Sequence, residues 1–585
     1  MKKNSFIKGL LFVLTMLLLF VQMIQERMKL FTFKPLNGVF VPTTEPHLTF
    51  ETYRTGQFQA QFEPFLKENL GFREPLIRFY NQFLFDFFKK SYNNDIIIGK
   101  DNWLYFIQHV NDYYGTEMYR WFDSKEEARQ AYDREAQLMW KLHGVLKEYD
   151  VDFLVFMAPQ KGFLYPEHLP NRKFDTTSIN AREYYSAKFD EYGFPYIEMT
   201  KWFKELKEAD TLPYSLFPQT GAHWCFSAAL ATDSLMRYMA DLKGINLPKL
   251  QFGTLHESTA EILENDYDIE NLANLMRPIR HDYDRLLDAE VTFTVDSTTT
   301  QPSAIFIGTS FLLRMYHFVP FDRIFPNSQF WYYNSTAYFG KDYQQVTRVA
   351  DLDMLSQLLE TDYVVWFSEG DQMCKASFGF AESALITLCS SKERKDEVYW
   401  QVMDSLRNDP AFLESCGDMN EVQRDANIWN TTHELILQQP EQFFPEIAGD
   451  GIPTARNPRI PEVMAIKQIK KDPDWVVKLR CQATYQSLPF DQIMKTEAQN
   501  LLNNSILLRD NTPTISREAY VESFVDAMTQ QMVGSPEMVT MIEQKAANNN
   551  TTYEEQLKAD ARWIVNSQID SGEIYWKPTT CDDSR

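Results

Sequence analysis

A short apolar strand that turns directly into a helix is the feature that most constrains this chain. The sequence contains the run Ala304-Ile305-Phe306-Ile307, which breaks at Gly308 and continues from Ser310 with a helical pattern of apolar residues. Two further runs, 151–157 and 363–367, are also strand-like, and a helical stretch at 125–149 precedes the first of them. Strands separated by helices predict a mainly parallel sheet whose faces are both covered, so the sequence indicates an α/β fold.

Most of the polar side chains that could take part in catalysis lie at the ends of these strands. In open α/β sheets the reactive groups lie beyond the carboxyl ends of the strands. We therefore expect three segments to surround one crevice, namely Pro159-Gln160-Lys161, Thr309-Ser310 and Ser368-Glu369-Gly370-Asp371. Ser310 would stand at a helix start, where backbone N–H groups can receive a developing oxyanion.

A histidine motif upstream supplies a base for this serine. The sequence reads Gly221-Ala222-His223-Trp224 about 85 residues before Gly308-Thr309-Ser310-Phe311. These two motifs resemble the SGNH-hydrolase-like proteins of the alginate O-acetylation type, whose pattern is Asp-x-His-Trp early and Gly-Thr-Ser-Phe/Tyr late. Further blocks share the resemblance, which covers roughly residues 60 to 390: Gly71–Arg78, Gly99–Tyr105, Ala158–Lys161 with Tyr165–Pro170, and the acidic stretch Tyr267–Leu272.

The resemblance implies an SGNH-like three-layer α/β/α sandwich in which the histidine precedes the serine. It implies that Ser310 is a nucleophile that takes an acetyl group from a membrane-bound O-acyltransferase and passes it to an exported polysaccharide, with His223 as general base. No metal or cofactor is expected for this chemistry, and the sequence contains no Gly-rich phosphate loop.

The chain departs from the pattern at the acid that would orient the histidine. Gly221 stands where the resemblance places an aspartate, so the orienting acid is absent there, and Gly221→Asp is expected to raise activity. Glu369 and Asp371 are the substitute carboxylates that we consider, with an exposed acidic turn as the alternative interpretation.

Two other functions remain open. A chain without the acid would be a glycan-binding or scaffold protein that grips sugar through aromatics such as Trp331, Tyr332 and Tyr333. Alternatively, the same serine and histidine would serve an acetylesterase that uses water as the acceptor.

The N-terminus predicts a membrane anchor. Lys2, Lys3 and Lys8 precede or begin a nearly continuous apolar stretch from Gly9 to Ile24, and no small-residue cleavage site follows. We therefore predict a signal anchor over 1–28, a linker over 29–60 and an SGNH-like domain over 61–395. The positive-inside rule and the resemblance together place the protein in a bacterial inner membrane as a single-pass protein facing the periplasm.

Charge and cysteine content exclude some functions and leave others open. The net charge of −23 argues against a nucleic-acid partner, which requires a basic face. The six cysteines show no metal-binding spacing, and an exported domain would permit disulfides, with Cys374 and Cys389 as a weak candidate pair. Cys225 is expected to be a buried small hydrophobe.

An internal repeat follows residue 395. Pro410, Pro473 and Pro536 are each preceded by Asp or Ser and are spaced 63 residues apart. Proline at the first helical position after an N-cap residue predicts three helix starts. Each unit would supply about three amphipathic helices, so 396–585 is predicted to form a helical repeat domain with its own core.

Overall fold

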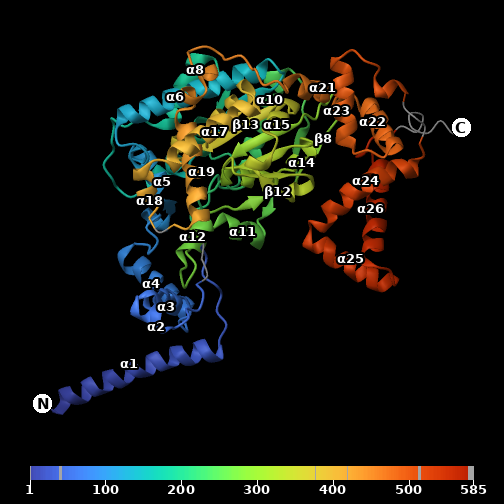
Figure 1. The fold of residues 1–585 in the computed structure, drawn as a ribbon. Coiled ribbons are helices and arrows are strands. Elements are labelled where there is room, and N and C mark those ends of the chain that lie inside the picture. Colours follow the sequence, from blue (N-terminus) through green and yellow to red (C-terminus); the bar gives the residue numbers. More distant parts are fainter. Residues whose placement is uncertain (1, 39–42, 376, 418, 512–514, 577–585) are drawn as a thin grey trace.

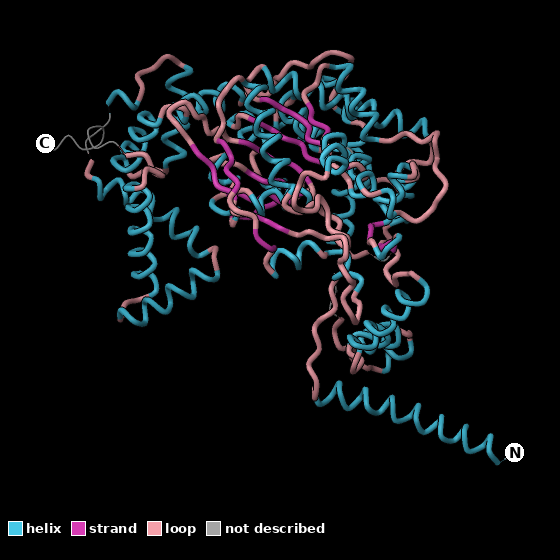
Figure 2. The backbone as a smooth tube through the Cα atoms, turned by 180° about the vertical axis from the view of Figure 1, so that it is seen from behind, coloured by secondary structure: helices cyan, strands magenta, loops and turns pink. Residues whose placement is uncertain are grey.

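A computed structural model describes residues 2–38, 43–375, 377–417, 419–511 and 515–576. A sheet lies at the centre with helices on both faces, and the C-terminal helices form an arm at one side (Figure 1). The view from behind shows the same central strands between two helical layers (Figure 2). Near the N-terminus, helices α2, α3 and α4 lie between the long helix α1 and the sandwich.

The central sheet has seven strands in the order β12-β11-β10-β9-β13-β3-β4. The five strands from β10 to β4 are parallel, and β10, β11 and β12 form an antiparallel meander at the edge. All residues of β3, β9 and β13 are buried, as the continuous apolar runs predict for strands covered on both faces. The bounds are β3 Asp152–Ala158, β4 Tyr196–Glu198, β9 Ala304–Gly308, β10 Gln329–Tyr332, β11 Thr336–Phe339, β12 Gln345–Arg348 and β13 Tyr363–Glu369.

Alternate residues of each central strand enter two separate cores. Phe153, Val155 and Met157 of β3 belong to one core, whereas Leu154 and Phe156 belong to the other. The first core is covered by α6 (Lys125–Lys147), α8 (Ala181–Tyr192), α15 (Met354–Glu360) and α16 (Phe380–Cys389). The second is covered by α9 (Thr200–Ala209), α10 (Ser227–Lys243), α13 (Ser310–Phe318) and α14 (Phe321–Ile324). This is the three-layer α/β/α sandwich that the resemblance implied.

Short hairpins and helices decorate the sandwich. The strand pairs are β1 (Ile96–Ile98) with β2 (Leu104–Phe106), β5 (Lys249–Phe252) with β8 (Val291–Thr294), and β6 (His256–Glu257) with β7 (Leu287–Asp288). Four further helices are α5 (Ile107–Tyr113), α7 (Lys161–Leu164), α11 (Ala260–Asp266) and α12 (Asp268–Ala273).

The C-terminal half contains three consecutive three-helix units, in each of which the first and third helices pack together. Pro410, Pro473 and Pro536 begin the middle helices, and Asp409, Asp472 and Ser535 cap them by accepting backbone N–H bonds, as predicted. The helices are α17 (Lys392–Arg407), α18 (Pro410–Ser415), α19 (Glu421–Gln438), α21 (Ile460–Lys470), α22 (Pro473–Gln486), α23 (Phe490–Leu502), α24 (Arg517–Val533), α25 (Pro536–Asn549) and α26 (Tyr553–Asp570).

The 63-residue period also holds where the second and third middle helices end. Ser487 and Asn550 both adopt the left-handed conformation that terminates a helix. The first unit differs, because Val398 and Ile436 belong to the core of the sandwich, as does Val463 at the start of the second unit. Separate helical cores begin at about Ala465, so packing divides the chain some 70 residues later than its composition does.

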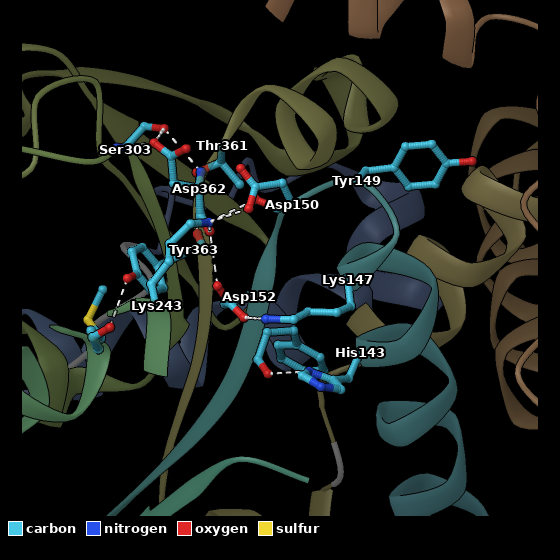
Figure 3. Close-up of polar contacts among 12 residues, drawn as sticks. His143, Lys147, Tyr149, Asp150, Asp152, Lys243, Ser303, Thr361, Asp362 and Tyr363 are labelled. Carbon is cyan, nitrogen blue, oxygen red and sulfur yellow. Dashed lines mark hydrogen bonds and ion pairs between the residues drawn. The ribbon is translucent and has the colours of Figure 1, made fainter. Parts of the chain in front are cut away.

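Charged side chains gather at the amino end of the sheet, which we call the amino edge, and Figure 3 shows Lys147 and Lys243 there beside Asp152 and Asp150. Lys147 Nζ lies 2.5 Å from Asp152 Oδ1, and Lys243 Nζ lies 3.3 Å from Asp150 Oδ1. The ammonium of Lys467 in α21 donates to the carbonyls of Thr361 (3.1 Å) and Tyr149 (3.3 Å). The helical array is therefore fastened to the sheet edge opposite the predicted crevice.

Helix α1 spans Lys2–Met28, where the signal anchor is predicted. Within the described ranges, the structure contains no helix with the length and apolarity needed to cross a membrane. Two short helices, α2 (Phe50–Arg54) and α3 (Gln57–Glu68), begin inside the segment predicted as a linker, and α4 (Arg73–Phe88) follows them.

The predicted disulfide between Cys374 and Cys389 is wrong. Cys374 and Cys389 are both free and buried, and Cys374 Sγ accepts a hydrogen bond from the Tyr132 hydroxyl instead. Cys225 is buried and free, as expected, and Cys481 is disulfide-bonded.

Candidate active site

The carboxyl ends of three neighbouring strands bring the predicted polar segments together. Strand β13 lies between β9 and β3, so Ser310, Glu369 and Gln160 follow adjacent strands in one parallel register. Ser310 is the first residue of α13, because the apolar strand breaks at Gly308 and Thr309 caps the helix. We call this end of the sheet the carboxyl edge.

The structure places His223 directly against Ser310. His223 Nε2 lies 2.7 Å from Ser310 Oγ, a distance typical of a hydrogen bond between a nucleophile and its base. The imidazole comes from the loop before α10, and it packs on the ring of Phe311 with centroids 4.9 Å apart. Both predicted residues therefore meet in one site.

The other imidazole nitrogen is occupied by a carboxylate that the sequence analysis did not select. His223 Nδ1 lies 2.6 Å from Asp268 Oδ2, at the start of α12. The second oxygen, Oδ1, accepts the backbone N–H groups of Ala222 (2.8 Å) and Ile269 (2.7 Å). Burial raises the pKa of Asp268, but the His223 imidazole and these hydrogen bonds outweigh burial and hold the pKa below its usual value. Asp268 is therefore ionised and able to stabilise an imidazolium.

No acid stands at Gly221, as the sequence analysis states, and Asp268 is the substitute carboxylate that it did not select. A Cβ atom at Gly221 would lie 1.8 Å from the backbone oxygen of Asp266, two residues before Asp268. Any side chain at 221 would thus push away the segment that delivers the acid. A glycine at this position and an aspartate at 268 belong to one arrangement.

Glu369 and Asp371, the predicted substitute acids, do not reach the imidazole. The Thr309 hydroxyl donates to Glu369 Oε2 at 2.6 Å, which fixes the cap of α13. Asp371 accepts from the side-chain amides of Gln160 (2.5 Å) and Gln372 (2.6 Å). Both carboxylates are buried beside the site, so the exposed acidic turn is wrong as well.

Lys161 holds the backbone of the histidine loop. Its fully buried ammonium donates to three carbonyls, those of Leu104 (2.7 Å), Gln219 (2.8 Å) and Gly221 (2.7 Å). Burial lowers the pKa of Lys161 to about 7, against the opposing charges of Asp284 and Asp268. The three N–H donors of one ammonium thus fix the segment that leads to His223.

Tyr333 is a second side chain at the serine. Its φ of +48° is rare for a residue with a side chain, and its backbone N–H donates to the Gly308 carbonyl at 2.9 Å. Burial raises the pKa of its hydroxyl more than the Ser310 side chain lowers it, so the hydroxyl stays neutral. The other two aromatics proposed for glycan binding differ, because Trp331 is buried in the core and Tyr332 is half-buried.

The sequence held a signal for the missed acid. Asp268 lies in the acidic block Tyr267–Leu272, which also holds Glu270 and directly follows Asp266, so the block indicated the region without selecting a residue. Asp266 instead pairs with Arg314, and Glu270 accepts from His281 Nε2 at 2.6 Å. In the described residues, no group of three His, Cys, Asp or Glu side chains is arranged to hold a metal ion.

Fold and site together define an SGNH-like α/β domain with a serine, a histidine and an aspartate in hydrogen-bond contact. Residues 96–324 match the family model "SGNH hydrolase-like domain, acetyltransferase AlgX". The chain therefore carries an SGNH-like domain of the alginate O-acetyltransferase type, with a helical region after it.

Three solved structures align with part of the chain, and no curated protein matches it. The O-acetyltransferase domain of Pseudomonas putida AlgJ aligns with a TM-score of 0.32 and 13% identity, over 48% of this chain and 92% of that one. Pseudomonas aeruginosa AlgX aligns with a TM-score of 0.31 and 15% identity, over 50% of this chain and 66% of that one. Bacillus cereus PatB1 aligns with a TM-score of 0.30 and 14% identity, over 49% of this chain and 99% of that one.

Proposed function

We propose that this protein is a membrane-anchored O-acetyltransferase that faces the periplasm and modifies an exported polysaccharide. The observation that carries the proposal is the unbroken contact from Ser310 through His223 to Asp268. The match to an acetyltransferase family supports acetyl as the transferred group. The apolar N-terminal stretch supports the anchor, and the disulfide-bonded Cys481 is in keeping with an oxidising compartment.

The first half of the reaction loads the serine. With its Nδ1–H donated to Asp268, His223 carries its lone pair on Nε2, which accepts the Ser310 proton. Ser310 Oγ then attacks the carbonyl carbon of the acetyl donor, and the C=O electron pair moves to oxygen. When the tetrahedral intermediate collapses, the bond to the donor breaks and His223 returns the proton to the leaving group.

The second half transfers the acetyl group to sugar. A sugar hydroxyl gives its proton to His223 Nε2 and attacks the acetyl carbon, and Ser310 leaves with that proton. The oxyanion formed in each half would be stabilised by the backbone N–H of Ser310 at the start of α13 and by the neutral Tyr333 hydroxyl, whereas the N–H groups of Phe311 and Leu312 already donate to Thr309.

Two alternatives from the sequence analysis fare differently. The binding-protein hypothesis rested on a missing acid, and Asp268 removes that ground. The acetylesterase uses the same residues with water as acceptor, so the acceptor decides between hydrolysis and transfer.

The test is acyl-enzyme formation by the full chain. The protein should release p-nitrophenol from its acetate ester, and a short incubation should add one acetyl mass to the peptide that contains Ser310. Ser310→Ala should abolish both signals. With an oligosaccharide acceptor, mass spectrometry should find O-acetylated sugar; free acetate alone would assign the protein as an esterase, and equal rates for the two proteins would reject the proposal.

A further inference from the structure

Helix α4 exposes a stripe of large apolar side chains. Leu76, Phe79, Phe83 and Phe87 recur at helical spacing, and Phe79, Phe83 and Phe87 are 61%, 42% and 73% exposed. Phe83 packs on the ring of Phe87, with centroids 5.0 Å apart. A contiguous apolar surface of this kind on a folded domain marks a contact with a partner or a membrane.

The stripe is part of a larger apolar region next to α1, which we call the N-terminal layer (residues 48–92). Gly71 passes so close to α1 that a Cβ atom there would lie 2.0 Å from the Gln22 carbonyl oxygen. Figure 1 shows α2, α3 and α4 between α1 and the sandwich. Further exposed apolar side chains of the layer are Leu48, Phe50, Tyr53, Phe62, Leu66, Tyr80, Phe88 and Tyr92.

The charge of this region is opposite to that of the chain. The layer, residues 48–92, holds six Lys or Arg and five Asp or Glu, a balance of +1, whereas the whole chain carries −23. The connection from α1, residues 27–47, adds three Lys or Arg and one Glu. An anionic bilayer repels an acidic protein, but it attracts a local excess of Lys and Arg. Aromatic rings beside basic residues are typical of segments that lie in the membrane–water interface.

The opposite face of α4 supports the catalytic acid. Asn81 Nδ2 donates to the Ala273 carbonyl at 2.9 Å, and Phe85 is buried in one cluster with Ile269 and Ala273 of α12. Helix α12 begins at Asp268, the partner of His223. Helix α4 thus exposes the apolar stripe on one face and packs with its other face against α12, the helix that begins at Asp268.

We propose that the N-terminal layer is a docking surface for an anionic lipid bilayer, and that docking turns the carboxyl edge toward the membrane. The proposal rests on the proposed function in one respect, because it sets the direction from which a membrane-supplied acetyl donor reaches Ser310. The amino edge then faces away from the bilayer, while the arm of α24, α25 and α26 descends beside the sandwich (Figure 1).

The test measures water access in full-length protein reconstituted into vesicles of phosphatidylethanolamine and phosphatidylglycerol. Phe87→Cys and Trp563→Cys are labelled with an environment-sensitive fluorophore, and labelled wild type provides the background. Trp563 in α26 is the matched control, because it is 71% exposed against 73% for Phe87. We expect blue-shifted emission and a severalfold lower iodide quenching constant at 87 than at 563, with a smaller difference in phosphatidylcholine vesicles.

Equal quenching at both positions would overturn the docking proposal. Protection of position 87 that needs added membrane proteins would also overturn it, because the surface would then bind a protein. In a triple variant, Phe79→Ser with Phe83→Ser and Phe87→Ser, a fluorophore at Tyr92→Cys should be quenched by iodide equally in the two kinds of vesicle. The triple variant should still hydrolyse p-nitrophenyl acetate within about twofold of the wild-type rate. Absence of hydrolysis in wild type would reject the proposed function and leave the quenching result unaffected.

Discussion

The two edges of the central sheet differ in whether their charged and polar groups have partners. At the amino edge, Asp150 and Asp152 face Lys243 and Lys147 at ion-pair distance, and Lys467 from α21 bonds two carbonyls of the sandwich. These contacts hold two parts of the chain together. They leave little chemistry to perform, because the charges are neutralised by one another.

At the carboxyl edge, several buried polar atoms have no partner within the described protein. They include His109 Nδ1, Asp112 Oδ2, Glu117 Oε2 and Gln160 Oε1. Burial lowers the pKa of His109 to about 4, so its imidazole is neutral near pH 7, and burial raises the pKa of Asp112 well above its usual value. Buried groups left unsatisfied reduce stability and gather at functional sites. The contrast predicts that mutations at the two edges separate activity from stability.

The largest effect should come from the acid of the site. Asp268→Asn should lower kcat/KM for p-nitrophenyl acetate by about 10⁴, because the amide favours the wrong imidazole tautomer and does not stabilise the imidazolium. Glu369→Gln is the matched control, since an amide oxygen still accepts the Thr309 hydroxyl. We expect the control to remain within about tenfold of wild type. A larger loss for Glu369→Gln than for Asp268→Asn would contradict the assignment.

A side chain at Gly221 should damage the same edge through the backbone. Gly221→Ala and Gly221→Asp should each lower the rate at least about tenfold and cost about 1–3 kcal/mol of stability, because the Asp266 carbonyl must move. Gly451→Ala is the control, as a Cβ atom there meets nothing within 4 Å. A rise in rate for Gly221→Asp would restore the idea that this position lacks its natural acid.

The sequence predicted this fold well where the signal is local. The runs at 304–307 and 363–367 are continuously apolar and the run at 151–157 is interrupted only by Asp152, a pattern typical of buried strands in a covered parallel sheet. The helix starts at Pro410, Pro473 and Pro536 were equally accessible, since an N-cap followed by proline acts within one turn.

The parts that were missed depend on contacts between distant segments. Asp268 reaches His223 across 45 residues, and the approach needs the space left by Gly221. A composition change at 395 could not reveal that Ile436 and Val463 complete the core of the sandwich. Expected domain borders followed composition, whereas packing decides where one core ends.

Breaking the amino edge should affect stability and spare activity. Lys467 is nearly buried, and burial lowers its pKa to about 8. Lys467→Met should cost about 1–3 kcal/mol in denaturant unfolding, because two buried carbonyls lose their donor, with an unchanged rate of ester hydrolysis. Lys470→Met, which breaks an exposed pair with Glu360, is the control and should cost about 0–1 kcal/mol. A parallel loss of rate would mean that the two edges are coupled.

The smallest effect is a difference in the pH dependence of stability at the two edges. Burial, followed by the charge of Asp371, raises the pKa of Glu117 to about 7, against about 4.3 in the unfolded chain. Between these two pKa values Glu117 is protonated in the folded state and ionised in the unfolded state. The free energy of unfolding therefore falls as the pH rises, and the stabilising effect of the Glu117 proton is lost above about pH 7. Glu117→Gln lacks this titration, and its free energy of unfolding should gain about 1–2 kcal/mol relative to wild type between pH 4.5 and 7.5.

Asp150 at the amino edge should show the opposite sign. Burial raises its pKa, but Lys243 and Lys471 lower it further, so the net pKa lies below the usual value. Its stabilising effect is therefore present above about pH 4 and disappears as the pH falls below that value. Relative to wild type, Asp150→Asn should lose a few tenths of a kcal/mol at neutral pH and nothing near pH 3, because the pair is exposed on the aspartate side. Unfolding curves for both variants at four pH values would show the two slopes, and parallel slopes would mean that burial at the carboxyl edge does not perturb its carboxyl groups.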